Sequence, residues 1–190
     1  MIGIMGGGKS RNIFISLLKK NNIKEIYHIS PLKNLASINN CGALLCKSML
    51  QSKNIDVEFA TNDLSWNLDN NKGLDDFIHF SFNLPKNNPN LNAFLYRNPN
   101  TTFAMFAMNV NVLTNFDNVY FTNINSTSNN AKIFNDFDNF NNLDFDIFRK
   151  NYSYPFPQDL KPYLQAEILI PNKINIKNLK LKKLLRYNKD

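Results

Sequence analysis

The stretch from Gln165 to Ile170 combines an apolar strand pattern with two polar side chains at its start. Alternation along a strand gives it two faces, one with Gln165, Glu167 and Leu169 and the other with Ala166, Ile168 and Ile170. A carboxylate beside an amide at the entrance to an apolar core is costly unless both groups find partners or take part in chemistry. Glu167 is therefore the first candidate for a catalytic group, and a solvated strand end with a basic neighbour is the alternative.

A second candidate group lies near the start of the chain. Ile23 to Ile29 has a strand pattern, and Ser30-Pro31 is predicted to begin a helix because Ser caps free N–H groups and Pro is tolerated at the first helical position. Gly42 is expected to end that helix. His28 would then lie at a strand end beside a helix N-terminus, where anionic ligands are favoured. A purely structural histidine is the alternative.

The elements that must position these groups are strands joined mostly by loops. Strands are expected at Phe77–Phe82, with His79 and Ser81 on one face, at Thr102–Val112 and at Val119–Phe121, and a short helix near Leu143–Arg149. The segments 83–92 and 123–162 are expected to be loops, the second being a surface loop or a substrate-binding lid. This pattern predicts an α+β fold of two packed, mostly antiparallel sheets with flanking helices.

Residues 3–10 match the phosphate-loop pattern G-x-x-x-x-G-K-S letter by letter. Such a loop binds phosphates only between a buried strand and a helix, and here only Met1 and Ile2 precede it. A helix could follow, with Ser10 as its cap and Ile13, Leu17 and Leu18 on one side. We therefore expect residues 1–10 to be a flexible start rather than a nucleoside-triphosphate site.

Length and composition limit the remaining possibilities. The 190 residues are predicted to form a single domain, 1–190, and no apolar run is long enough for a membrane span. No secretory leader is recognisable, so a cytoplasmic location is expected. Cys41 and Cys46 are the only cysteines, and without neighbouring His or further Cys they make a poor metal site. No metal is expected.

The net charge of +7 is concentrated at the end of the chain. Residues 173–190 carry seven of the 22 basic residues and one of the 15 acidic residues, so the rest of the chain is almost neutral. This basic segment interleaves lysines with leucines, so that one face could pack while the other contacts nucleic-acid phosphates. A solvated terminus that aids solubility is the alternative.

Four blocks of the sequence, between Leu17 and Ile174, resemble the DarT-type ADP-ribosyltransferases. Residues 26–38 with 42–45 are similar to the family's Tyr-His-[Ile/Phe]-Thr opening, its Asn-Leu-x-Ser-Ile helix and its Gly-Leu-Leu exit. Residues 62–63 and 68–69 lead to the strand at 77–82. Residues 121–128 resemble an Asn-Ala-Ala-Ser stretch that follows a strand, and the fourth block is 165–171. The order and spacing of the four blocks are fairly specific for this family.

The resemblance implies an ADP-ribosyltransferase fold and the transfer of ADP-ribose from NAD onto a base of single-stranded DNA. It implies Glu167 as the catalytic glutamate, because a carboxylate stabilises the charge that develops on the ribose. Gln165 stands where relatives that modify arginine carry a second Glu, which makes an amide-bearing base a plausible acceptor. Implied NAD-binding residues are His28, Ser30, Asn34, Asn67 and Arg97, and implied substrate-loop or DNA contacts are Asn125, Arg149 and Tyr163.

One departure from the family concerns Asn67, which stands where the family carries an Arg just before a Leu-Asp pair. An amide cannot replace the charge and fork geometry of a guanidinium, and Arg97 or Arg149 would have to reach the phosphates from another direction. The loop from about Lys132 to Tyr163 resembles the family's substrate loop, whose aromatic residues could stack on bases.

The leading hypothesis is therefore an NAD-dependent DNA ADP-ribosyltransferase, the toxin of a toxin–antitoxin pair. The family implies a macrodomain-type antitoxin as partner. Within the enzyme class, an RNA-directed NAD-dependent transferase is an alternative. From another class, the alternative is a catalytically inactive nucleic-acid-binding module with this fold. The acceptor base, its sequence context and the oligomeric state are left open by the sequence.

Overall fold

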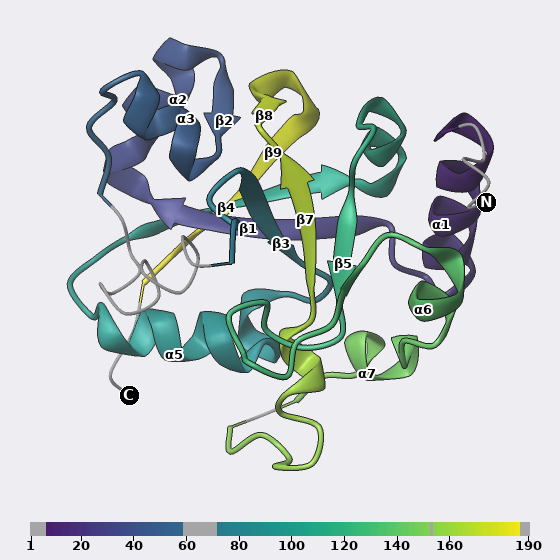
Figure 1. Ribbon diagram of the computed structural model, residues 1–190. Coiled ribbons are helices and arrows are strands. Elements are labelled where there is room, and N and C mark those ends of the chain that lie inside the picture. Colours follow the sequence, from purple (N-terminus) through teal and green to yellow (C-terminus); the bar gives the residue numbers. More distant parts are fainter. Residues whose placement is uncertain (1–6, 59–71, 153, 187–190) are drawn as a thin grey trace.

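The structure, a computed structural model, describes residues 7–58, 72–152 and 154–186 and is built on one large antiparallel sheet (Figure 1). Its strand order is β6-β5-β7-β3-β1-β4-β9, and a second sheet pairs β2 with β8. The strands are β1 (Glu25–Pro31), β2 (Ala43–Leu45), β3 (Phe77–Ser81), β4 (Phe103–Asn109), β5 (Tyr120–Thr122), β6 (Ile133–Phe134), β7 (Glu167–Pro171), β8 (Lys173–Asn175) and β9 (Leu179–Leu185). The predicted α+β class with antiparallel sheets is confirmed.

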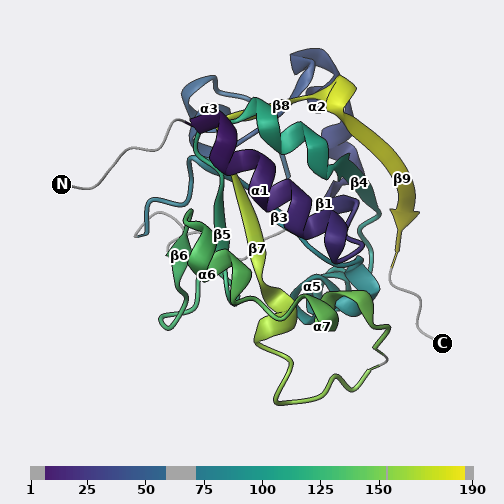
Figure 2. The ribbon, with the colours of Figure 1, turned by 90° about the vertical axis from the view of Figure 1, so that its right-hand side faces the viewer.

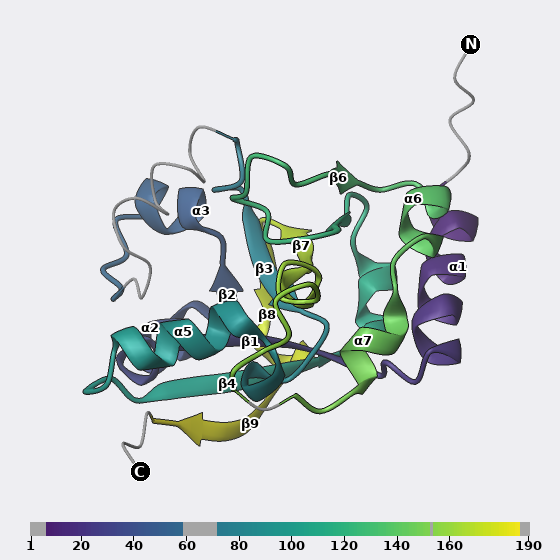
Figure 3. The ribbon, with the colours of Figure 1, turned by 90° about the horizontal axis from the view of Figure 1, so that it is seen from below.

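Short helices cover the sheet and its ends. The α-helices are α1 (Gly7–Lys20), α2 (Leu35–Cys41), α3 (Lys47–Ser52), α5 (Pro89–Arg97), α6 (Phe137–Asn141) and α7 (Phe145–Arg149). The 3-10 turns are η1 (Leu32–Asn34), η2 (Pro85–Asn87), η3 (Val110–Asn115), η4 (Tyr163–Gln165) and η5 (Ile176–Asn178). Figure 2 shows α1 lying along the sheet with α6 beside it, while Figure 3 shows β9 at the outer edge, next to β4. None of the helices in the described ranges is long and apolar enough to cross a membrane.

The core is dominated by phenylalanine rings that join the helices to the sheet. Phe14 of α1 lies 5.2 Å from Phe121 of β5 and 5.0 Å from Phe140 of α6, measured between ring centroids. Phe121 and Phe140 are 4.2 Å apart, and Phe145 of α7 joins them. Aromatic pairs at these separations stabilise beyond the area they bury. The cluster therefore fixes α1, α6 and α7 against one side of β5.

The first predicted helix begins later than expected. β1 runs on through Ser30 and Pro31, with Pro31 paired with Phe103 of β4, and the turn η1 precedes α2. β1 pairs with β3 only at Tyr27, which lies opposite Ser81. The missing N–H of Pro31 therefore interrupts no hydrogen bonding between β1 and β3. Ser30 is consequently a buried strand residue and not a helix cap. The end of the helix agrees with the prediction, since Gly42 adopts φ 62° as its C-cap.

Two boundaries around residues 83–112 also differ from the prediction. The expected loop at 83–92 contains η2 and the start of α5, because Asn88 accepts hydrogen bonds from the N–H groups of Asn90 and Leu91 and Pro89 follows it. The expected strand to Val112 stops at Asn109, whose side chain caps the next turn, η3. In both places an Asn cap ended the previous segment and began a helical turn.

The first and last described segments form regular elements. Helix α1 begins at Gly7, so residues 7–10 of the predicted flexible start are helical and Ser10 lies inside the helix. Its buried side is made by Phe14, Ile15 and Leu18, whereas Ile13 is exposed. The basic segment from Lys173 forms β8, η5 and the edge strand β9, where Lys182 pairs with Glu25 of β1 at 2.7 Å.

Neighbouring residues of α1 provide a test of the aromatic core. Replacing buried Phe14 with Ala should lower the free energy of unfolding by about 3 kcal/mol or more, because it removes a large side chain and leaves a cavity between α1 and β5. Exposed Ile13→Ala is the matched control and should change that free energy by less than about 1 kcal/mol. Urea unfolding measures both, and equal losses would contradict this account of the core.

Candidate active site

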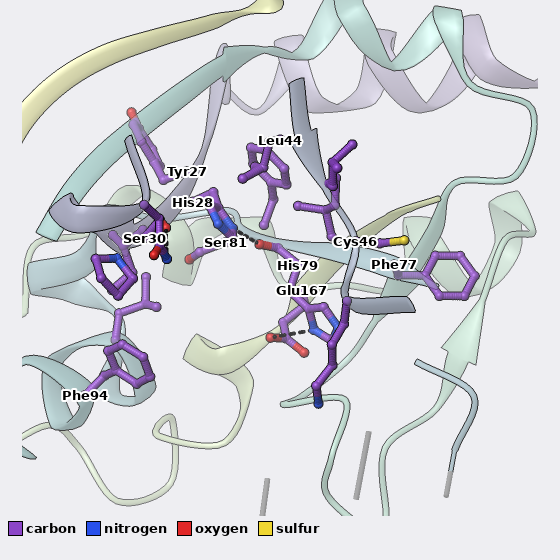
Figure 4. Close-up of a pocket in the computed structure, with 18 of the residues that line it drawn as sticks. Tyr27, His28, Ser30, Leu44, Cys46, Phe77, His79, Ser81, Phe94 and Glu167 are labelled. Atoms are coloured by element: carbon purple, nitrogen blue, oxygen red, sulfur yellow. Dashed lines mark hydrogen bonds and ion pairs between the residues drawn. The ribbon is translucent and has the colours of Figure 1, made fainter. Parts of the chain in front are cut away.

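A cavity of about 310 Å³ opens between β1, β3 and β7, the α2–β2–α3 segment and α5 (Figure 4). Its size suits a small-molecule ligand. It brings together seven of the residues predicted for the site, which are far apart in the sequence: His28, Ser30, Asn34, Arg97, Asn125, Gln165 and Glu167. The antiparallel pairing of β1 with β3 and of β3 with β7 is what places His28 and Glu167 at one opening.

Two other predicted site residues, Arg149 and Tyr163, do not line this cavity. Arg149 ends α7 and forms an ion pair with Asp146. Tyr163 lies in η4 with half of its surface exposed. Neither is among the described residues of the cavity wall. Asn67 lies outside the described residues.

Glu167 begins β7 and is held from two directions. Its Oε2 atom accepts a hydrogen bond of 2.9 Å from the backbone N–H of Ser126, and its Oε1 atom lies 3.4 Å from Nδ1 of His79. Its own backbone N–H donates to Oγ1 of Thr122, a fully buried hydroxyl that donates in turn to the carbonyl of Ile124. The carboxylate is thus fixed at the start of the strand, and only 14% of the side chain is exposed.

These contacts decide the protonation state of Glu167. Burial by itself raises the pKa of the carboxyl group, but the positive charge of His79 and the hydrogen bonds from His79 and Ser126 outweigh it, so the pKa is lowered overall. The side chain is therefore an anion at neutral pH. A fixed anion in a partly water-excluded cavity is well suited to stabilise positive charge on a reacting sugar.

The strand predicted to start at Gln165 begins at Glu167 in the structure. Glu167 does enter the cavity, but Leu169, which shares its face, is fully buried. β7 lies inside the sheet between β5 and β3, and its residues Ile168, Leu169 and Ile170 are all fully buried. Gln165 precedes the strand in η4, where its Nε2 donates to the carbonyl of Lys161 at 2.9 Å.

His28 is held as a neutral hydrogen-bond acceptor. Its Nδ1 lies 2.9 Å from the backbone carbonyl of His79, which can only accept, so Nδ1 carries the hydrogen and Nε2 has the free lone pair. Burial, followed by the nearby charge of His79, lowers the pKa of His28 to about 4, although the hydrogen bond to the carbonyl acts in the opposite direction. The ring also packs on Phe80, with centroids 5.5 Å apart.

Asn34 has its side chain engaged within the protein. Its Nδ2 donates to Oγ of Ser30 at 3.2 Å and to the carbonyl of Glu58 at 2.8 Å, and its Oδ1 accepts from the N–H of Glu58 at 2.8 Å. The amide therefore holds residue 58 against β1 as another strand would. Asn34 shapes the cavity wall, and the hydroxyl of Ser30 retains its hydrogen for another acceptor.

A buried cluster of amides links the cavity to the segment that leads into β7. Asn88 donates to Oγ of Ser81 at 2.9 Å, and Oγ of Ser81 lies 2.7 Å from Oδ1 of Asn83. Asn83 reaches the carbonyl of Leu164, directly before Gln165, at 3.4 Å and that of Asn87 at 2.9 Å.

Asn87 extends this cluster to the other end of the same segment. Its Nδ2 donates to Oδ1 of Asn151 at 3.2 Å and to the carbonyl of Lys150 at 3.3 Å, and its Oδ1 accepts from the N–H of Tyr152. Asn83 and Asn87 are both almost fully buried. Through them, both ends of the segment 150–164 are attached to the cavity wall by neutral hydrogen bonds.

Sequence reasoning missed two residues of the site. It placed His79 on the polar face of its strand but gave it no role, and it quoted Ser126 only as part of a matching block. The polar alternation of β3 was the available signal. His79 belongs to a site only because its strand is paired with the strand of Glu167. The two residues are 88 positions apart, and the sequence does not reveal that their strands are neighbours.

Solved structures with the same arrangement define the class of the fold. Thermus sp. 2.9 DarT in complex with ADP-ribosylated ssDNA matches with a TM-score of 0.65 and 17% identity, covering 88% of this chain and 83% of that one. Its complex with NAD+ gives 0.61 and 17%, covering 83% and 80%. Thermosipho africanus DarTG in complex with ADP-ribose gives 0.64 and 22%, covering 83% of this chain and 43% of that one. The fold is that of the DarT ADP-ribosyltransferases.

A family model that matches the sequence identifies the family. The profile of DarT, described as ssDNA thymidine ADP-ribosyltransferase, matches residues 27–181. The chain therefore belongs to the DarT family, which confirms the family and the enzyme class predicted from the four blocks. A comparison with curated proteins gives no match.

The state of His28 predicts how stability depends on pH. In the unfolded chain a His gains its proton near pH 6.5, but in the folded chain only near pH 4, so the folded state loses stability as the pH falls between these values. His28→Asn keeps an N–H donor at the position of Nδ1 and cannot titrate. Between pH 7 and pH 5 the wild type should lose about 2 kcal/mol more unfolding free energy than this variant.

Urea unfolding at the two pH values measures this difference, and all other titrating groups are common to both proteins. An equal loss in wild type and variant would show that His28 is not held neutral by burial.

Proposed function

We propose that this protein transfers ADP-ribose from NAD to thymine in single-stranded DNA, with Glu167 as the catalytic carboxylate. The observation that carries the proposal is the anionic side chain of Glu167, fixed by Ser126 and His79 inside the cavity. The family described as ssDNA thymidine ADP-ribosyltransferase supports the choice of reaction and acceptor. NAD enters as a co-substrate and is consumed.

The residues of the cavity wall have the chemistry that NAD requires. The neutral His28 offers Nε2 as an acceptor for a ribose hydroxyl, and Ser30 offers a hydroxyl hydrogen. Arg97, at the end of α5, supplies a guanidinium for the pyrophosphate. The apolar part of the wall includes Leu44 and Phe94, which suit aromatic rings.

Glu167 acts on the bond between nicotinamide and ribose. As this bond breaks, its electron pair leaves with neutral nicotinamide and positive charge develops on the ribose carbon and ring oxygen. A carboxylate that is already fixed and ionised stabilises this charge without reorganising. The same carboxylate can accept a hydrogen bond from a ribose hydroxyl, which orients the sugar for attack from the opposite side.

The acceptor side of the site is formed by the residues around β7. Gln165 presents an amide beside Glu167, and Asn125 lines the same opening. Thymine has two carbonyl oxygens and one ring N–H, which an amide can pair with. Further out, Tyr163 and Tyr154 are exposed and can stack on neighbouring bases, while Arg149 can contact the phosphate backbone.

Arg97 is assigned the phosphate role because of the departure at Asn67. The family carries an Arg at the position of Asn67, and an amide has neither its charge nor its fork geometry. Arg97 is the arginine that lines the cavity within the described residues. Asn67 itself keeps its proposed place near NAD.

The biological setting proposed for this chain is a toxin–antitoxin pair. The similarity to Thermosipho africanus DarTG supports it, and a macrodomain-type antitoxin that removes ADP-ribose would be the partner. We place the activity in the cytoplasm, where a cell keeps both DNA and NAD available. The two cysteines are free thiols, in keeping with a reducing compartment.

Replacing Glu167 with Gln tests the proposal directly. The variant keeps the size of the side chain but loses its charge, so transfer should fall by roughly 10²- to 10³-fold or more. The assay incubates the protein with NAD and four single-stranded oligonucleotides, each lacking one base, and follows DNA mass by mass spectrometry. Wild-type protein should add ADP-ribose to every oligonucleotide except the one without thymine.

Two results would contradict the proposal. An adduct of full yield with E167Q would remove Glu167 from catalysis, provided circular dichroism shows both proteins folded. Salt-sensitive DNA binding by the wild type without release of nicotinamide would instead identify an inactive nucleic-acid-binding module.

A further inference from the structure

The turn 125–128 carries the backbone N–H that holds Glu167, and it lies beyond the end of a strand. The pairing of β5 with β7 reaches Phe121, and β5 itself ends at Thr122. The chain then leaves the sheet, yet Ser126 has to present its N–H to Oε2 of Glu167 at 2.9 Å. Sheet pairing therefore does not by itself fix the donor that orients the carboxylate.

Local hydrogen bonds give the turn part of its shape. Oδ1 of Asn125 accepts from the backbone N–H of Thr127 at 2.9 Å and from its hydroxyl at 2.5 Å. The N–H of Ser128 donates to the backbone carbonyl of Asn125 at 3.0 Å. A short amide side chain commonly closes a turn in this way. All of these bonds lie within the turn, so they shape it without attaching it to the rest of the site.

Lys72 attaches the turn to another segment of the chain. Its ammonium group donates to the backbone carbonyl of Ser126 at 3.0 Å and to that of Ser128 at 2.5 Å. Lys72 shortly precedes β3, which pairs with β7 on the side opposite β5. The turn that leaves β5 is thus connected, across β7, to the segment that leads into β3.

The surroundings of Lys72 are unusual for a lysine. The residue is partly buried, and it forms no ion pair with a carboxylate of the described ranges. A lysine normally keeps its charge in water or beside a carboxylate, because desolvation of a charge is costly. Hydrogen bonds from a charged donor are roughly twice as strong as neutral ones, and here two of them converge on a single turn. Lys72 is therefore well suited to hold the turn in place.

Lys72 has no direct contact with the reacting groups. Asn125, Ser126 and Thr127 line the cavity, whereas Lys72 is not among the described residues of its wall. The two oxygens of Glu167 are contacted by Ser126 and by a neighbouring imidazole, and not by the ammonium group. An effect of Lys72 on the carboxylate has to pass through the position of Ser126.

We propose that Lys72 is a positioning residue of the transfer reaction, which fixes the turn 125–128 and thereby the N–H of Ser126 that orients the carboxylate of Glu167. This inference rests on the proposed function. A reacting group that is displaced by about 1 Å can slow an enzyme by roughly 10²-fold. Lys72 therefore contributes to the rate of the chemical step, whereas the binding of NAD by the rest of the cavity wall does not depend on it.

Three substitutions of Lys72 separate its charge from its hydrogen bonds. Lys72→Arg keeps both the charge and the donors, Lys72→Gln keeps donors without the charge, and Lys72→Met keeps neither. Lys24→Met is the matched control, because Lys24 is exposed, is not among the described residues of the cavity wall and loses the same charge.

Amide hydrogen exchange, followed by mass spectrometry, measures whether Lys72 holds the turn. In K72M the peptide that covers residues 121–131 should exchange roughly tenfold faster than in the wild type, because the turn opens more often. K72R and K24M should stay close to the wild type, and K72Q should lie between. Peptides from the buried strand β4 should be unchanged in every variant. Unchanged exchange of the turn in K72M would overturn the proposal.

The rate of adduct formation on a thymine-containing oligonucleotide, measured over a range of NAD concentrations, tests the consequence for the reaction. K72M should lower kcat by roughly 10- to 10²-fold and leave the KM for NAD within about threefold of the wild-type value. K72R should recover most of kcat, and K24M should match the wild type. If K72M does not fold, the same difference is expected, with smaller size, between K72Q and K72R.

Two kinetic results would overturn the proposal. A wild-type kcat in K72M and K72Q would show that the turn needs no help from Lys72. A KM for NAD that rises as much as kcat falls would show a general disturbance of the cavity instead of an effect on Glu167. Absence of any adduct with the wild type, together with faster exchange of the turn in K72M, would overturn the proposed function, so the two failures are distinguishable.

Discussion

The site depends on the register between β3 and β7. Ser81 pairs with Glu167, so His79 reaches the carboxylate from the neighbouring strand and Thr122 of β5 holds its backbone from the other side. A slip of one residue would turn Glu167 into the core and expose Ile168 to the cavity. The fully buried Ile168 and Ile170 and the Phe cluster beyond β5 make that slip costly. The packing of the apolar side chains of β7 thereby fixes the position of the Glu167 carboxylate.

The local parts of this arrangement could be predicted from the sequence, and the parts that join distant segments could not. The strands around His28, His79 and Glu167 follow from alternation, and the end of α2 follows from Gly42. The resemblance in four blocks supplied the family and named seven residues of the cavity wall. The pairing of His79 with Glu167 depends on which strands are neighbours, and a sequence pattern has no information on that.

The wrong boundaries have a common physical cause in the many asparagines. The Asn-rich segment 83–92 was predicted to be a loop and a strand was predicted to continue to Val112, but Asn88 and Asn109 act as helix caps. Asn34 holds residue 58 in place of a strand. A short amide can cap, turn or bridge, and the choice depends on partners far away in sequence. The buried cluster of Asn83, Asn87 and Asn88 is the strongest example, because four of its hydrogen bonds reach the segment 150–164 and others reach Ser81 of β3.

The hydrogen bonds of that amide cluster respond to salt differently from ionic contacts with a nucleic acid. The attachment of the segment 150–164 to the cavity wall uses uncharged donors and acceptors that are shielded from solvent, so dissolved salt has little effect on it. Contacts between lysines and a nucleic-acid backbone weaken steeply with salt. A higher ionic strength can therefore weaken the binding of a nucleic acid while the geometry of the reacting groups stays unchanged. In this protein, the affinity for a substrate strand and the shape of the catalytic centre can vary independently.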